Sequence, residues 1–97
     1  MIDVQRTDVF MKWLDGLRDD KAVARISNRI DRLMFGNPGE VKSVGEGVSE
    51  MKIDYGPGYR LYFTKRGKVI VLLLCGGTKG TQERDIKRAI KMAMELG

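Results

Sequence analysis

Histidine is absent from this chain of 97 residues. Its absence removes the commonest general acid and base, the commonest zinc ligand, and every serine–histidine or cysteine–histidine nucleophile. Any catalysis must therefore use lysine, arginine, a carboxylate, tyrosine or backbone groups. No metal and no cofactor is predicted from these residue types.

Cysteine and long apolar runs are also scarce. Cys75 is the single cysteine, so no internal disulfide can form, and its place at the end of an apolar segment favours a small buried side chain over a catalytic thiol. The longest apolar run, residues 69–75, is far shorter than the roughly 20 residues that span a bilayer. The N-terminal segment lacks the basic-then-apolar order of a signal peptide. These features predict a soluble, cytoplasmic protein without a membrane partner.

Positive charge, by contrast, is in excess. Lysine and arginine number 18 and aspartate and glutamate 13, which gives a net charge of +5. A basic surface attracts phosphate backbones whatever their sequence, although many basic proteins bind no nucleic acid. A chain of this length has room for one hydrophobic core, so residues 1–97 are expected to form a single domain.

The first half of the chain has the apolar spacing of helices. A short strand at residues 2–5 precedes a helix for which Thr7 is the predicted N-cap. A second helix runs to about residue 35, where a segment rich in glycine and proline ends it.

From residue 41 onward the apolar period changes to two. Strands are predicted at 41–44, 48–54, 59–65 and 68–75. The glycine-containing turns between them are typical of antiparallel hairpins. The run at 69–74 does not alternate, which predicts a central strand buried on both faces. With a last helix from about residue 81, the predicted fold is α+β: β-α-α, then an antiparallel β meander, then a C-terminal helix.

One side of the second predicted helix carries basic residues at spacings of four, four and three. They are Lys21, Arg25, Arg29 and Arg32. This spacing forms one ridge, which could bind RNA or a partner, or could simply be a solvated face. We assign Arg25, Arg29 and Arg32 as candidate nucleic-acid contacts, together with the aromatic Tyr62.

Alternation also places charged side chains on one face of the predicted hairpin. Glu50 and Lys52 share a face of their strand, and Arg60 and Tyr62 share the matching face of the next strand. The pattern predicts a charged, partly aromatic, solvent-accessible sheet face. An ordinary solvated face with cross-strand ion pairs explains the same pattern.

Residues 76–81 form a glycine-rich segment before the last helix. Such a turn can offer backbone N–H groups to a phosphate, but the spacing of a P-loop is absent, so nucleotide hydrolysis is not expected. A simple connection from strand to helix also explains the glycines. Lys79 emerges near the end of the preceding strand and could face the same concavity as Arg60.

Four segments together carry a family resemblance. They are FMKWLDGLRD near the start, RISNRIDRL in the second predicted helix, GVSEMKIDYGPGYRLYF at 47–63 and VLLLCGGTKGTQERDIKRA at 71–89. With them the chain resembles RelE/ParE toxins, specifically the phage-derived, Gp49-like and HigB-type branch of addiction module killer proteins. The resemblance implies a RelE-like (microbial RNase-like) fold and the toxin role in a type II toxin–antitoxin system.

The resemblance also implies partners and an activity. A cognate helix-turn-helix antitoxin is expected, with operator DNA contacted only through it. RelE-like members cleave mRNA in the ribosomal A site, so the ribosome and mRNA are the further expected partners, and translation is inhibited as a result.

Site roles follow residue by residue from the resemblance. Arg60 matches the arginine that stabilises the phosphate in the transition state, Glu50 and Lys52 occupy the positions of a charged pair, and Lys79 matches a basic residue after the last strand. Two departures stand out: glutamate replaces lysine at position 50, and no tyrosine follows Tyr62 to match a C-terminal aromatic residue. In metal-independent cleavage Glu50 would accept the 2′-hydroxyl proton, Arg60 and Lys52 would stabilise the phosphorane, and Lys79 would assist the leaving group.

Two other functions stay open. A ParE-like toxin that inhibits DNA gyrase by binding would need no catalytic residues. A phage-derived binding protein without catalysis or toxicity is the other alternative.

Overall fold

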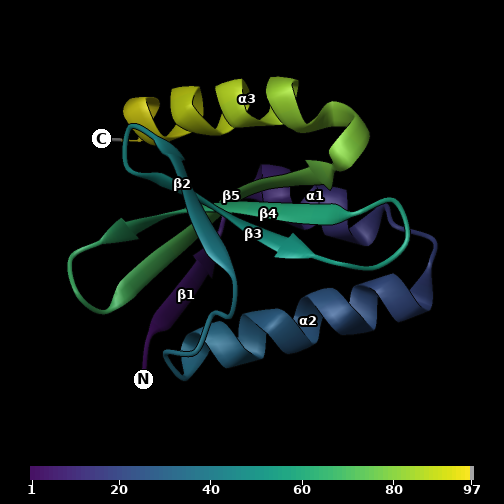
Figure 1. The fold of residues 1–97 in the computed structure, drawn as a ribbon. Coiled ribbons are helices and arrows are strands. Elements are labelled where there is room, and N and C mark those ends of the chain that lie inside the picture. Colours follow the sequence, from purple (N-terminus) through teal and green to yellow (C-terminus); the bar gives the residue numbers. More distant parts are fainter. Residues whose placement is uncertain (97) are drawn as a thin grey trace.

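A computed structural model describes residues 1–96. In this part of the chain the strands are β1 (Asp3–Arg6), β2 (Val41–Gly45), β3 (Val48–Ile53), β4 (Tyr59–Arg66) and β5 (Ile70–Thr78). The helices are α1 (Asp8–Asp15), α2 (Asp20–Met34), the short 3-10 helix η1 (Lys79–Thr81) and α3 (Gln82–Glu95). The predicted α+β class is confirmed, and η1 is an element that the sequence did not predict (Figure 1).

All five strands belong to one mixed sheet in the order β1-β5-β4-β3-β2. The predicted antiparallel meander is confirmed for β2 to β5, and β1 joins it at the edge, parallel to β5. Helices α1 and α2 pack on one face of this sheet and α3 packs on the other (Figure 1). No α-helix within residues 1–96 has the length and apolar character needed to cross a membrane.

Each face of the sheet has its own apolar core. Alternation along β4 sends Leu61 and Phe63 toward α1 and α2, into a cluster with Phe10. The opposite cluster contains Tyr62 of β4 and Ala89 of α3. Helix α3 therefore covers the sheet face on which alternation puts the charged side chains.

The N-terminus of α1 is tied to the sheet by its cap. As predicted, Thr7 is the N-cap: its hydroxyl oxygen accepts a hydrogen bond from the backbone N–H of Phe10 at 3.1 Å. The same hydroxyl donates to the carbonyl oxygen of Leu74 in β5 at 2.6 Å. One side chain thus fixes where α1 starts and where it meets the sheet.

Strand β5 is an interior strand with residues in both cores, as predicted, but it is longer than predicted and is not the middle strand. The middle of the sheet is β4, and β5 lies between β4 and β1. Residues 59–64 of β4 are all buried, although several of them are polar. Strand β5 also continues through Gly76 and Gly77, so the predicted glycine-rich turn is wrong. A Cβ atom on Gly77 would overlap the carboxylate of Asp85 in α3, which explains glycine at that position without a phosphate.

Candidate functional site

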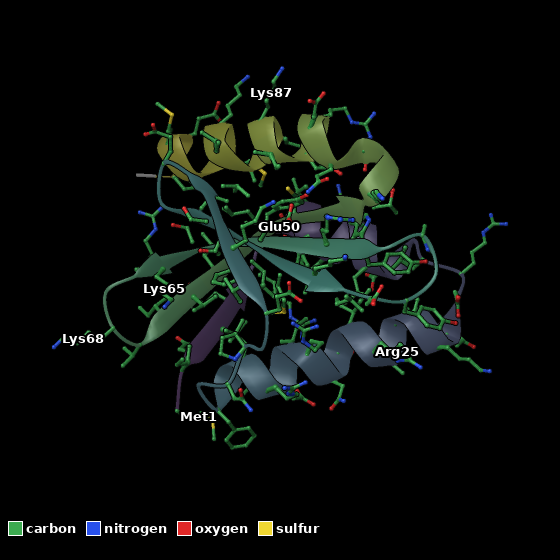
Figure 2. The ribbon with its side chains drawn as sticks, in the orientation of Figure 1. Met1, Arg25, Glu50, Lys65, Lys68 and Lys87 are labelled. Carbon is green, nitrogen blue, oxygen red and sulfur yellow. The ribbon has the colours of Figure 1, made fainter. Side chains whose placement is uncertain are left out.

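Alternation correctly predicted which side chains share a sheet face. The register of β3 and β4 pairs Glu50 with Tyr62 and Lys52 with Arg60. The predicted exposure of this face is wrong, because α3 lies over it: Glu50 is 5% exposed, Arg60 6% and Tyr62 0%. Figure 2 shows Glu50 inside the molecule between the sheet and α3. Lys52, near the end of β3, remains exposed.

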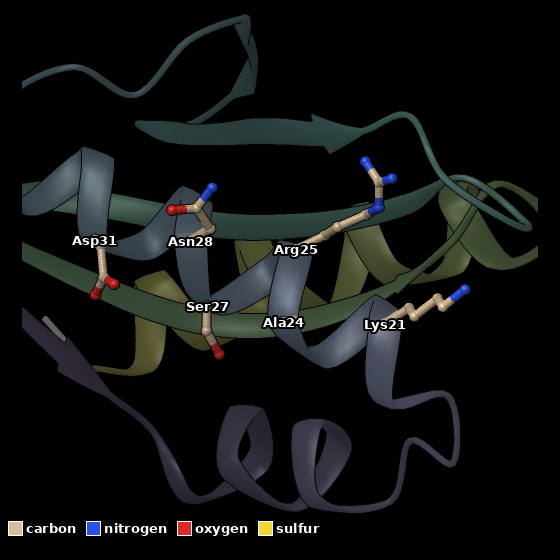
Figure 3. A pocket seen from close by; sticks show the side chains of 6 residues that line it. All are labelled: Lys21, Ala24, Arg25, Ser27, Asn28 and Asp31. Atoms are coloured by element: carbon tan, nitrogen blue, oxygen red, sulfur yellow. The ribbon is translucent and has the colours of Figure 1, made fainter.

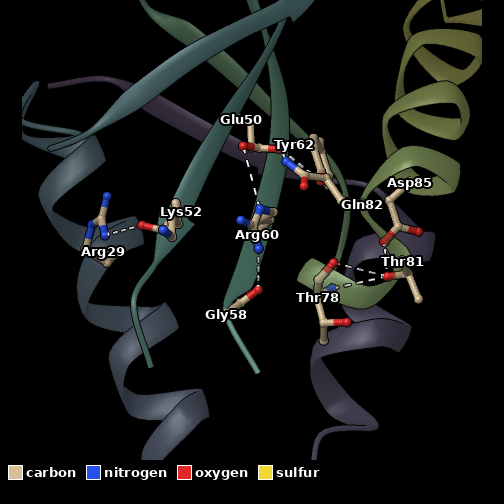
Figure 4. Close-up of polar contacts among 10 residues, drawn as sticks. All are labelled: Arg29, Glu50, Lys52, Gly58, Arg60, Tyr62, Thr78, Thr81, Gln82 and Asp85. Carbon is tan, nitrogen blue, oxygen red and sulfur yellow. Dashed lines mark hydrogen bonds and ion pairs between the residues drawn. The ribbon is translucent and has the colours of Figure 1, made fainter. Parts of the chain in front are cut away.

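The guanidinium of Arg60 is buried but only partly paired. Its Nη1 donates to the carbonyl oxygen of Gly58 at 2.9 Å. Its Nε is buried without a hydrogen-bond partner and lies 3.7 Å from Oε1 of Glu50 (Figure 4). Charge-assisted hydrogen bonds between such groups are about 2.7–2.9 Å long. The Arg60–Glu50 contact is therefore an ion pair without a hydrogen bond, and the Nε–H of Arg60 is left without an acceptor.

The Glu50 carboxylate is held through its other oxygen. Its Oε2 accepts one hydrogen bond from the Tyr62 hydroxyl at 3.1 Å and another from Nε2 of Gln82 at 2.9 Å (Figure 4). Burial, followed by the charge of Glu50, raises the pKa of Tyr62 above its usual range. Tyr62 therefore acts as a neutral donor to Glu50. Its complete burial also rules out the predicted contact between Tyr62 and a nucleic acid.

A pocket opens beside Arg60, with a volume of about 200 Å³. We call it the Arg60 pocket; its lining residues are Glu40, Lys42, Glu50, Lys52, Arg60 and Gln82. Three of them are cationic and two anionic, so the lining has a net charge of 3 − 2 = +1. A small pocket with a buried, incompletely paired arginine is suited to an anion such as a phosphate group.

Sequence reasoning missed three residues of this pocket: Glu40, Lys42 and Gln82. Lys42 was within reach of such reasoning, because β2 pairs with β3 and puts Lys42 directly opposite Glu50. Gln82 was not, because it enters the pocket from the first residue of α3. Its position depends on how α3 docks on the sheet, which no local pattern reports.

Lys79 lies next to the Arg60 pocket but does not line it. It begins η1, and its backbone N–H donates to the carbonyl oxygen of Pro57 at 3.4 Å. Its exposed side chain borders a separate hollow of about 420 Å³ formed by residues 79–84. A side chain on Gly58 would contact both Arg60 Nη1 and Lys79 Cβ. Lys79 and Arg60 are thus neighbours across Gly58.

Arg29 does not belong to an exposed basic ridge, contrary to the prediction. Its Nη1 donates to the carbonyl oxygen of Lys52 at 2.7 Å and its Nη2 to that of Pro38 at 3.0 Å. Burial, with the charge of Arg32 as a second cause, lowers the pKa of Arg29. Arg29 therefore joins α2 to β3 and to the segment before β2.

The other basic residues of α2 remain on the surface. Lys21, Arg25 and Arg32 are exposed. The guanidinium carbon of Arg25 lies 4.7 Å from the ring centre of Tyr55, in cation–π geometry. A shallow hollow of about 610 Å³ runs along this helix (Figure 3), lined by Lys21, Ala24, Arg25, Ser27, Asn28 and Asp31. Its carboxylate and its mixed polar lining give it less positive character than the predicted ridge.

Within residues 1–96, no three side chains of histidine, cysteine, aspartate or glutamate are grouped so that they could hold a metal ion.

The chain is similar to a known bacterial protein. No family model matches the chain. It is 49% identical over 96 residues to a Haemophilus influenzae protein described as uncharacterized, and the match covers 99% of this chain and 97% of the relative. The similarity therefore extends over the whole fold, including the three strands and the helix that contribute to the Arg60 pocket.

Proposed function

The chain belongs to the same protein family as the uncharacterized protein of Haemophilus influenzae, and we propose that it is the toxin of a RelE/ParE-type toxin–antitoxin system. In this proposal it has the RelE-like fold, acts in the cytoplasm and cleaves mRNA on the ribosome. The antiparallel meander between two helical layers supports the fold assignment. The residue resemblance described above supports the toxin role.

One observation carries the catalytic part of the proposal. The buried Arg60 guanidinium keeps donor capacity at the wall of a small pocket, with the Glu50 carboxylate on one side and exposed lysines at the mouth. A phosphodiester bound there would place its negative charge against Arg60 and its ribose near Glu50. Preorganised donors of this kind stabilise charge that develops during phosphoryl transfer.

The reaction would follow from these positions. The ribose 2′-hydroxyl loses its proton to Glu50 and attacks the adjacent phosphorus, and the P–O5′ bond breaks to leave a 2′,3′-cyclic phosphate. Arg60 and Lys52 stabilise the phosphorane, and Lys79, beyond Gly58, donates a proton to the departing 5′-oxygen. The ribosome would supply alignment of the mRNA, which can contribute about 7–11 kcal/mol to such a step.

The burial of Glu50 and Arg60 also supports a second candidate. An oppositely charged pair with exposed fractions of 5% and 6% could serve the fold alone. The protein would then act only by binding, either as a ParE-like inhibitor of DNA gyrase or as a phage-derived binding protein.

Induction of the chain alone, followed by mapping of mRNA 5′ ends, separates these functions. Catalysis predicts growth arrest with new 5′ ends inside translated codons. Inhibition of gyrase predicts arrest with DNA damage and intact mRNA, and a binding protein without toxicity predicts normal growth. Purified protein is expected to cleave free RNA slowly or not at all and to cleave mRNA on translating ribosomes. Rapid cleavage of free RNA would contradict the dependence on the ribosome.

Arg60→Lys tests the site itself, because it keeps the charge and removes the forked donor geometry. We expect it to reduce mRNA cleavage by about 100-fold, in line with the loss of a preorganised transition-state donor. Arg84→Lys is the matched control, since Arg84 is exposed on α3. Melting temperatures show whether Arg60→Lys still folds. Undiminished cleavage in a folded Arg60→Lys protein would remove Arg60 from the mechanism.

A further inference from the structure

Glu50 is itself an anion beside the cation that a phosphate would need. A carboxylate free to approach Arg60 would form a hydrogen-bonded ion pair of about 2.7–2.9 Å and satisfy the guanidinium. In this protein Oε1 of Glu50 stops 3.7 Å from Nε of Arg60. Some contact must therefore hold the carboxylate back.

That contact comes from Tyr62 and Gln82. Both donate to the same oxygen of Glu50, Oε2, at 3.1 and 2.9 Å. Tyr62 belongs to the sheet, whereas Gln82 is brought to the pocket by α3 and also lines it. Figure 4 shows the Gln82 amide beside the Glu50 carboxylate, next to Tyr62.

We infer that Gln82 is a positioning residue that keeps Arg60 available to a phosphate group by holding Glu50 away from it. The inference rests on the proposed binding of a phosphodiester at Arg60. Without the Gln82 amide, Oε2 keeps a single donor and the carboxylate can turn onto the guanidinium. Glu50 then competes with the phosphate for Arg60.

The size of the pocket defines the ligand class. A volume of about 200 Å³ is below the range of about 300–1,000 Å³ that holds drug-sized ligands. It admits a phosphate group but leaves the bases outside. The ligand is therefore the sugar–phosphate backbone of a nucleic acid, and the pocket itself reads no base.

Binding of a dinucleotide that cannot be cleaved tests the inference. The probe is UpU with a 2′-O-methyl group on the attacking ribose, titrated by isothermal calorimetry or NMR. We expect Gln82→Leu to weaken binding by about tenfold, the effect of losing one charge-assisted hydrogen bond. In Glu50→Gln the neutral amide no longer competes with the phosphate, so binding should tighten. Gln82→Leu added to Glu50→Gln should then cost nothing further.

A second measurement reports the same event without ligand. In Gln82→Leu the Nε proton of Arg60 should move downfield in the NMR spectrum, because Glu50 accepts its hydrogen bond. Arg60→Lys identifies this resonance by removing it. A purely structural role for Gln82 would not shift this proton. Under such a role, the effect of Gln82→Leu on binding would also persist in the Glu50→Gln background.

Gln5→Leu is the matched control, since Gln5 is exposed on β1 and its side-chain amide donates to Asp3. Gln82→Ala repeats the test if the leucine variant unfolds. Three results would overturn the inference. They are unchanged binding in a folded Gln82 variant, equal weakening by Gln82→Leu in the Glu50→Gln background, and no binding of the dinucleotide by the wild-type protein. If the variants bind the dinucleotide as expected but the chain cleaves no mRNA in cells, the inference is supported and only the proposed function is rejected.

Discussion

The indole ring of Trp13 in α1 lies directly on the backbone of Gly76 in β5. A Cβ atom built on Gly76 would overlap the six-membered ring of the indole. Trp13 also packs against Tyr59 and Phe10, with ring centres 6.3 and 5.7 Å away. Glycine at position 76 is thus what lets α1 approach the sheet.

Gly76→Ala should therefore destabilise the protein. Because the ring is held by its aromatic neighbours, a methyl group forces α1 outward, and overpacking of this kind costs about 1–3 kcal/mol. Urea unfolding measures the change. Gly80→Ala is the control, since the nearest atom to a Cβ there is 3.7 Å away; its effect should stay within about 0.5 kcal/mol. Equal stability of Gly76→Ala and Gly80→Ala would contradict this account.

The same contact shows what sequence patterns could and could not predict. Periods of two and 3.6 depend on local geometry, so they identified the strands and the shared face of Glu50 and Arg60 correctly. The preference of threonine for the N-cap position is local too, and it identified the Thr7 cap. Gly76 fits the strand pattern only weakly, so the sequence predicts that it lies in a turn. Its role depends on Trp13, which is far away in the sequence.

The burial of the candidate site was unpredictable for a similar reason. Polar residues that alternate with apolar ones in β4 indicate one solvated face. Here α3 covers that face and the polar groups pair with one another instead, as Glu50 does with Tyr62 and Gln82. Such pairing becomes visible only once the helix is docked.

The hydrogen bonds of Arg29 to two backbone carbonyl groups predict that it stabilises the fold. Replacing it with methionine keeps the apolar stem and removes the hydrogen bonds to the carbonyl oxygens of Lys52 and Pro38. We expect a loss of about 1–3 kcal/mol in the free energy of unfolding. Arg32→Met is the matched control, because it removes the same charge from an exposed position of the same helix.

Unfolding of both proteins in urea measures the difference. If Arg32→Met is destabilised as much as Arg29→Met, the loss comes from net charge or helix propensity and not from the carbonyl contacts.

The buried thiol of Cys75 makes stability depend on pH. Burial, with the negative charge of Asp85 as a second cause, raises the pKa of Cys75 from 9.0 to about 11. The folded state therefore keeps a proton that the unfolded state releases. The contribution is fully present below pH 9.0 and is lost as pH rises toward about 11.

Cys75→Ala removes this dependence. The cavity left by the substitution lowers stability at every pH. Between pH 8 and 10.5, however, the free energy of unfolding should fall less in Cys75→Ala than in the wild-type protein. The other ionisable groups are the same in both proteins, so the difference isolates the thiol. If stability falls with pH in parallel in the two proteins, Cys75 ionises alike in the folded and the unfolded state. Ellman's reagent should react with Cys75 only at the rate of unfolding.

The proposed antitoxin should approach the mouth of the Arg60 pocket. Lys42 and Lys52 are exposed there, and a net charge of +5 favours rapid association with an acidic segment. Reversing both charges, Lys42→Glu with Lys52→Glu, should slow association by about tenfold. The control is Lys65→Glu with Lys68→Glu: it changes the net charge equally at the far end of β4, where both lysines are exposed (Figure 2).

Co-expression with the adjacent small reading frame supplies the partner for this measurement. Durable neutralisation needs buried apolar contacts as well as steering. The complex should therefore survive purification in about 0.5 M salt, although association slows because the Debye length is then only a few ångströms. Equal slowing by both charge reversals would place the partner elsewhere on the surface. If no neighbouring product binds and the chain alone is harmless, the toxin proposal fails and a binding protein becomes the better account of this fold.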